Sequence, residues 1–75
     1  MWSQTYRKHF IMAFPSFDTA TRKWRVQADI SWCGGNRRHS TFVRYTRYQP
    51  TEAEAVHSAV QQSIEWIDGR LTFER

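Results

Sequence analysis

The sequence predicts an α+β fold in which one C-terminal helix packs on one face of a three-stranded antiparallel β-meander, in the order β-β-β-α. Three observations indicate this fold: strict alternation of apolar and polar residues over 23–32, strand-like composition over about 5–14 and 40–48, and a helical pattern over about 52–68. With 75 residues the chain has room for a single domain, residues 1–75, and too little for a second core.

The first predicted strand, about 5–14, alternates imperfectly and ends before Pro15. The residues that we expect on its buried face are Tyr6, Phe10, Met12 and Phe14, while Arg7, His9, Ile11 and Ala13 lie on the other. The second, 23–32, has the clearest pattern, and its buried face consists of Trp24, Val26, Ala28, Ile30 and Trp32.

The third predicted strand, about 40–48, leaves two assignments open. Either Val43 and Tyr45 face the core, or Phe42 and Tyr48 do. We favour the first assignment because it leaves Arg44 in water. The residues Gly34-Gly35-Asn36 tolerate positive φ and predict a hairpin turn before this strand.

The helix has recognisable signals at both ends. Thr51 and Glu54 form a capping box at its start, and Gly69 is a natural left-handed residue at its end. An apolar stripe at helical spacing runs between them and is expected to join the core: Val56, Val60, Ile64 and Ile67.

Charge is divided unevenly along the chain. Residues 1–48 carry nine Lys or Arg against two Asp, a net +7, whereas residues 49–75 carry two Arg against five Asp or Glu, a net −3. This polarity allows an anionic partner on the basic side or head-to-tail self-association. A single cysteine, a longest apolar run of only Phe10 to Phe14 and no secretory signal pattern favour a cytoplasmic protein without a membrane partner.

Residues that could carry chemistry are few. Cys33 and the histidines lack zinc-type spacing, so we expect no metal and no cofactor. Nucleophilic catalysis would have to use Cys33 as the nucleophile and His39 as its base. Because no third group to orient the histidine is evident, we expect no enzyme activity.

The sheet face opposite the helix is the best candidate binding surface. Its expected members are basic residues around one aromatic ring: Arg7, His9, Lys23, Arg25, Arg37, Arg38, Phe42 and Arg44. We favour a small non-enzymatic module that binds a protein partner or a second copy of itself. The alternative is single-stranded nucleic acid, with phosphates on the arginines and a base stacked on Phe42.

The chain resembles a family of small uncharacterised β-β-β-α proteins from beta-proteobacteria over roughly residues 5–69. The resemblance implies the fold without an active site, and it rests on the order of Tyr6 and Phe10, Trp24-Arg25, Ala28-Asp29-Ile30, Glu52-Ala53-Glu54-Ala55-Val56 and Trp66-Ile67-Asp68. The segment from Thr51 to Trp66 is more loosely similar to the helix of HicB-type antitoxin domains. The chain differs from those domains in having Cys33-Gly34-Gly35-Asn36 after the second strand.

Overall fold

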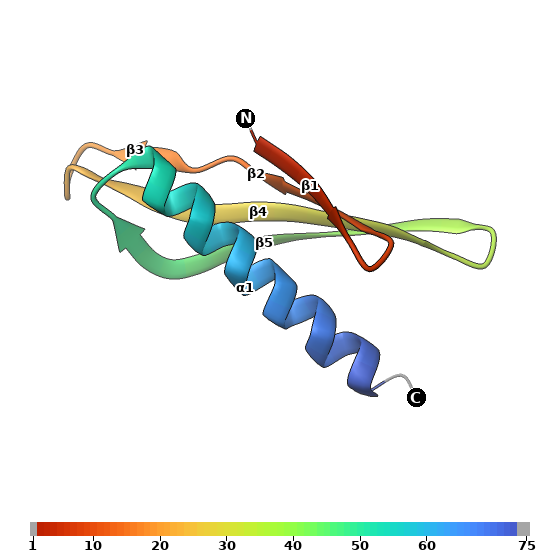
Figure 1. Cartoon of the computed structure of the whole chain (residues 1–75). Coiled ribbons are helices and arrows are strands. Elements are labelled where there is room, and N and C mark those ends of the chain that lie inside the picture. The colour runs from red at the N-terminus through yellow and green to blue at the C-terminus, as the bar shows by residue number, and fades with distance from the viewer. Residues whose placement is uncertain (1, 74–75) are drawn as a thin grey trace.

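The computed structural model of the protein describes residues 2–73. Along the chain the elements are β1 (Trp2–Tyr6), β2 (His9–Ala13), β3 (Ser16–Asp18), β4 (Lys23–Gly34), β5 (Arg37–Gln49) and α1 (Glu52–Phe73) (Figure 1). This confirms an antiparallel sheet with one C-terminal helix. The predicted strand number is wrong, because the sheet has five strands rather than three.

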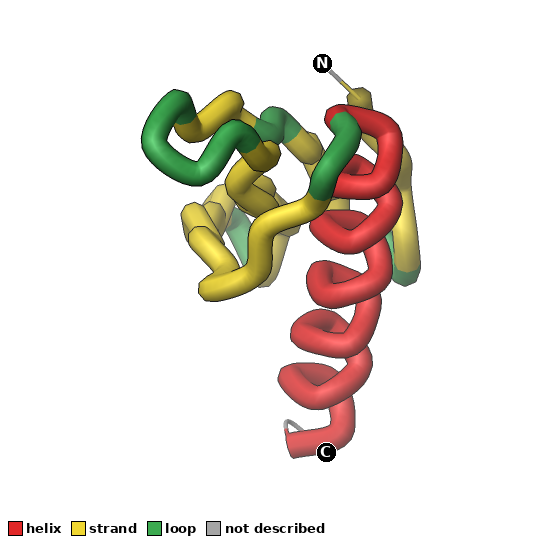
Figure 2. Tube along the Cα trace, turned by 90° about the vertical axis from the view of Figure 1, so that its left-hand side faces the viewer, coloured by secondary structure: helices red, strands yellow, loops and turns green. Residues whose placement is uncertain are grey.

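Strand β4 lies at the centre of the sheet. β2 and β3 pair with one edge of β4, one after the other, while β5 pairs with its opposite edge and β1 pairs with the outer edge of β2. Helix α1 covers one face of this sheet, so the molecule has two layers (Figure 2). We call the face toward α1 the helix side and the opposite face the open face.

Residues 5–14 form parts of two strands rather than one. Arg7 and Lys8 have left-handed backbone angles, with φ of 48° and 66°, and make a two-residue turn between β1 and β2. Such turns usually contain Gly, Asn or Asp, so Arg-Lys gave no signal in the sequence. Because the chain reverses there, Tyr6 pairs with His9 and shares its face.

The two faces of β2 are therefore the reverse of those predicted. His9, Ile11 and Ala13 are buried on the helix side, whereas Phe10 and Met12, predicted as core, lie on the open face. Where the first half of the helix meets the sheet, four residues with no exposed surface are alanines: Ala13, Ala28, Ala55 and Ala59. A helix that approaches over alanines leaves little depth for a phenylalanine ring beneath it.

The pattern predicted for 23–32 is confirmed. Val26, Ala28 and Ile30 have no exposed surface, and Val43 and Tyr45 pack on the same side, as in the favoured assignment of the third strand. Strands β4 and β5 are longer than predicted, and only two residues remain in the turn, where Gly35 has a φ of 62°. The end of this hairpin projects beyond the other strands (Figure 1).

The start of α1 is confirmed, since the hydroxyl oxygen of Thr51 accepts a hydrogen bond from the backbone N–H of Glu54 at 3.1 Å. The predicted end at Gly69 is wrong, because the helix continues to Phe73. The last turns dock on the sheet: the guanidinium carbon of Arg70 lies 4.3 Å from the Trp32 ring centroid, and Leu71 packs against the buried isoleucines. These contacts offset the roughly 1 kcal/mol by which glycine disfavours a helix relative to alanine.

The predicted stripe of α1 is confirmed at Val60 and Ile67, but the buried face is rotated from it. Its buried residues are Ala55, Ala59, Val60, Ser63 and Ile67, while Val56 and Ile64 are only partly buried. Within residues 2–73, no helix is long and apolar enough to cross a membrane.

Candidate functional site

Strand register decides which side chains share the open face. From β2 across β4 to β5 they form three rows: Phe10–Ser31–Ser40, Met12–Asp29–Phe42 and Phe14–Gln27–Arg44. Arg25 and Tyr48 form the next row, and Lys23 and the pair Cys33–Arg38 lie toward the two ends of β4. Five of the eight predicted site residues are therefore on this face: Lys23, Arg25, Arg38, Phe42 and Arg44.

Four aromatic rings lie on the open face, where the sequence predicted one. Phe10, Phe42 and Tyr48 are 37%, 52% and 36% exposed, and Phe14 contacts Phe42 with ring centroids 5.5 Å apart. The amide Nε2 of Gln27 donates to the carbonyl oxygen of Phe14 at 3.0 Å, so this loop residue is tied to the central strand. Sequence analysis missed Phe10 and Phe14 because the turn at Arg7–Lys8 gave no signal.

The arginines of the open face lie beside these rings. Arg25 donates from Nη2 to the hydroxyl oxygen of Tyr48 at 2.9 Å, and its guanidinium carbon is 5.4 Å from the ring centroid. Arg44 is exposed one row away, next to Phe42 along β5. Asp29 is an acid within the same surface, partly buried between Met12 and Phe42.

Three predicted site residues lie elsewhere. Arg7 is in the β1–β2 turn and donates from Nη1 to Oδ1 of Asp68 on α1 at 2.8 Å. Arg37 pairs with Gly34 at the end of the hairpin, and alternation puts it on the helix side. His9 is 4% exposed and also lies on the helix side, because β2 begins after the turn.

The contact between Arg7 and α1 has a clear electrostatic consequence. The hydrogen bond from Arg7 holds the pKa of Asp68 below its ordinary value. Tyr6 also donates its hydroxyl to Asp68, at 3.0 Å to Oδ1, and this bond raises the pKa of Tyr6. The β1–β2 turn is thus fastened to the helix by polar contacts rather than free to meet a ligand.

His9 belongs to a cluster around Trp32 on the helix side. Its Nδ1 lies 2.8 Å from the Arg7 carbonyl oxygen, so Nδ1 carries the proton and Nε2 accepts from Nη1 of Arg70 at 3.1 Å. The Trp32 ring contacts the rings of His9, His39 and Trp66, with centroid distances of 5.3–5.6 Å. These contacts join the hairpin, β2 and α1, which is a structural role for His9.

Cys33 and His39, the candidate nucleophile and base, lie on opposite faces of the hairpin formed by β4 and β5. Cys33 pairs with Arg38 on the open face, while His39 stacks on Trp32 on the helix side. Within the described part of the chain, no three His, Cys, Asp or Glu side chains gather as metal ligands would.

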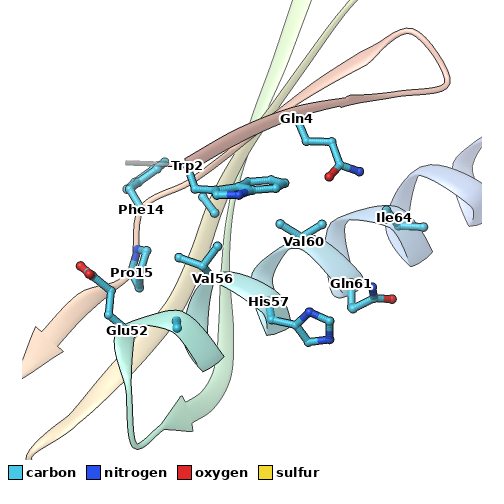
Figure 3. Close-up of a pocket in the computed structure, with 12 residues that line it drawn as sticks. Trp2, Gln4, Phe14, Pro15, Glu52, Val56, His57, Val60, Gln61 and Ile64 are labelled. Carbon is cyan, nitrogen blue, oxygen red and sulfur yellow. The ribbon is translucent and has the colours of Figure 1, made fainter.

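A second surface, which sequence analysis did not predict, is a groove of about 730 Å³ between β1 and the first half of α1 (Figure 3). Trp2 projects over it from β1, and Val56, Val60 and Ile64 face it from the helix. Glu52 and Gln61 lie at its rim. The pattern that could have indicated this groove is the alternation of Trp2, Gln4 and Tyr6 with Ser3 and Thr5. It indicates a separate strand only once the turn at Arg7–Lys8 is known.

Comparison with known proteins gives no relative: no protein-family model, curated protein or solved structure matches the chain. The resemblances described for residues 5–69 and for Thr51 to Trp66 therefore stay predictions.

Proposed function

We propose that the protein binds single-stranded nucleic acid on its open face. What supports the proposal most is the presence of four aromatic rings beside arginines on one uncovered antiparallel sheet face. Bases stack on exposed rings and phosphates bind arginines, and sheets that present two or three rings are a recurrent platform for single-stranded RNA. A net charge of +4 favours the same class of partner.

The rings and cations have different roles in this proposal. Phe42, the most exposed ring of the four, stacks a base, and Phe10 stacks a second. Arg44 and Arg25 bind the phosphates that run beside these bases. The contact of Arg25 with Tyr48 supports this role, because a guanidinium already held in place loses less side-chain entropy on binding.

Asp29 gives the proposed site a base preference. A carboxylate repels phosphates but accepts hydrogen bonds from the exocyclic amino group of a base. Because Asp29 lies next to Phe42 in the middle of the face, we expect cytosine or adenine to be preferred over thymine or uracil at the base stacked on Phe42.

The test is fluorescence anisotropy with labelled oligonucleotides of about twelve nucleotides, one oligo-dC and one oligo-dT, at several salt concentrations. Affinity should fall with salt by about 0.7 log units per log unit for each phosphate neutralised. Phe42→Ala should remove about 1–3 kcal/mol of binding free energy and leave this slope unchanged. Asp29→Asn should bring the oligo-dC and oligo-dT affinities closer together.

Arg44 and Arg47 provide a matched pair of variants on β5. Arg44 is on the open face, whereas Arg47 borders the helix on the other side. Arg44→Ala should flatten the salt slope by about one phosphate's worth, and Arg47→Ala should flatten it less. Equal effects of the two variants, or affinity that does not change with salt, would contradict binding on the open face.

A further inference from the structure

We infer that the groove between β1 and α1 binds an extended peptide, which adds a strand to the free edge of β1. The partner class is a segment with apolar side chains at alternate positions and a basic residue on the same face as them. This site is on a different surface from the open face and does not depend on nucleic-acid binding. It would give the protein-interaction role expected from the sequence a definite location.

The edge of β1 has unpaired backbone groups that suit an added strand. In the described sheet β1 pairs only with β2. The N–H of Phe14, just after β2, donates to the carbonyl oxygen of Gln27 on β4. Because alternate residues of an antiparallel strand direct their N–H and C=O groups to the same neighbour, the even-numbered residues of β2 bond to β4 and the odd-numbered ones to β1. By the register of β1 and β2, the N–H and C=O groups of Ser3 and Thr5 then point outward from the sheet edge.

The groove lies where alternate side chains of such a strand would enter it. A peptide residue opposite Gln4 would point to the helix side, because residues paired across an antiparallel ladder share a face. There it would meet the apolar wall formed by Val56, Val60 and Ile64 (Figure 3). A peptide that lies between an edge strand and a helix obtains affinity from main-chain hydrogen bonds and specificity from alternate side chains.

Charge distinguishes this groove from the rest of the molecule. The chain has 11 Lys or Arg residues, yet none is among the twelve residues that line the groove. The one formally charged residue in the lining, counting histidine as neutral, is Glu52, and Glu54 follows it in the same helical turn. An anionic ligand therefore finds no cation here, whereas a peptide with basic residues finds carboxylates.

The test uses three peptides and needs no change to the protein. The first is acetyl-Val-Thr-Val-Thr-Lys-amide, in which the Lys shares a face with the two Val, and the other two carry one N-methyl group, on the second Thr or on the second Val. The N–H of Thr would face β1, because its side chain lies on the side away from the helix, whereas the N–H of Val would face solvent. Titrations followed by backbone amide shifts should show changes at residues 2–5 and at Val56 and Val60. Methylation of Thr should weaken binding by about tenfold, and methylation of Val should have little effect.

Ser3→Pro and Ser3→Ala form a matched pair in the protein. Proline removes the outward N–H of Ser3 but not a bond to β2, so Ser3→Pro should lose peptide binding while Ser3→Ala keeps it. Equal effects of the two N-methyl groups, amide shifts on the open face, or no binding of the first peptide at millimolar concentration would overturn the proposal. It would also be overturned if sedimentation and amide exchange showed that a second copy of the chain already protects the β1 edge.

Discussion

Gly69→Ala tests the C-terminal half of the helix, where the structure differs from the prediction. Gly69 lies inside α1, has no positive φ, and a Cβ added to it would meet no atom within 4 Å. Alanine should therefore stabilise the protein by about 0.5–1 kcal/mol, since glycine loses more backbone entropy in a helix. For a domain of this size, that corresponds to a rise in Tm of roughly 2–8 °C. Thermal unfolding followed by circular dichroism measures it.

The sign of this change decides between two structures. If Gly69 ended the helix in a left-handed conformation, alanine would destabilise the protein by about 1–2 kcal/mol, and a fall in Tm would refute the continuous helix. Gly35→Ala is the control, because Gly35 has a φ of 62° and alanine there should lower Tm by this mechanism. An unchanged Tm for Gly69→Ala would mean that the last turns of α1 are not formed in solution.

Two further predictions concern the packing of α1. Ile67→Ala should lower the free energy of unfolding in urea by about 2–5 kcal/mol and Ile64→Ala clearly less, since Ile67 is fully buried and Ile64 partly so. The opposite order would mean that Ile64 rather than Ile67 lies at the centre of the buried helix face. Because the pKa of Asp68 is lowered, its stabilising effect is present above its ordinary value of 3.8 and is lost as pH falls below it. Asp68→Asn should therefore lower Tm at neutral pH and make Tm fall less steeply as the pH is lowered. Plots of Tm against pH that run parallel for the variant and the wild type would argue against the Arg7–Asp68 contact.

The elements that sequence analysis located correctly are those with strong local patterns. Apolar and polar residues alternate over 23–32 of strand β4, and the Thr51 cap fixes the start of α1. In each case the local pattern and the tertiary packing favour the same structure. The assignment of Val43 and Tyr45 to the helix side followed from a single consideration, that Arg44 needs water, and is also correct.

The errors arise where tertiary contacts override a local signal or where no signal exists. Arg7 and Lys8 adopt positive φ without Gly or Asn, and this one turn changed the strand count and reversed the faces of β2. For that reason the sequence pattern predicts Phe10 and Phe14, two of the four rings of the open face, in the core. At Gly69 the local signal was strong, but the docking of Arg70 and Leu71 on the sheet carries the helix past it.

The exposure of large rings on the open face supports the binding role proposed for it. Burial of a large apolar side chain contributes about 1.5–3 kcal/mol, and a small domain needs such contributions. Here isoleucines, valines and the rings of Trp24 and Trp32 pack beside the alanines on the helix side, while Phe10 and Phe42 remain 37% and 52% exposed on the other face. Packing alone would favour burial of Phe10 and Phe42 as well, because an exposed ring loses part of this contribution. A surface that keeps its rings exposed beside Arg25 and Arg44 is better explained by a ligand that stacks on them than by stability.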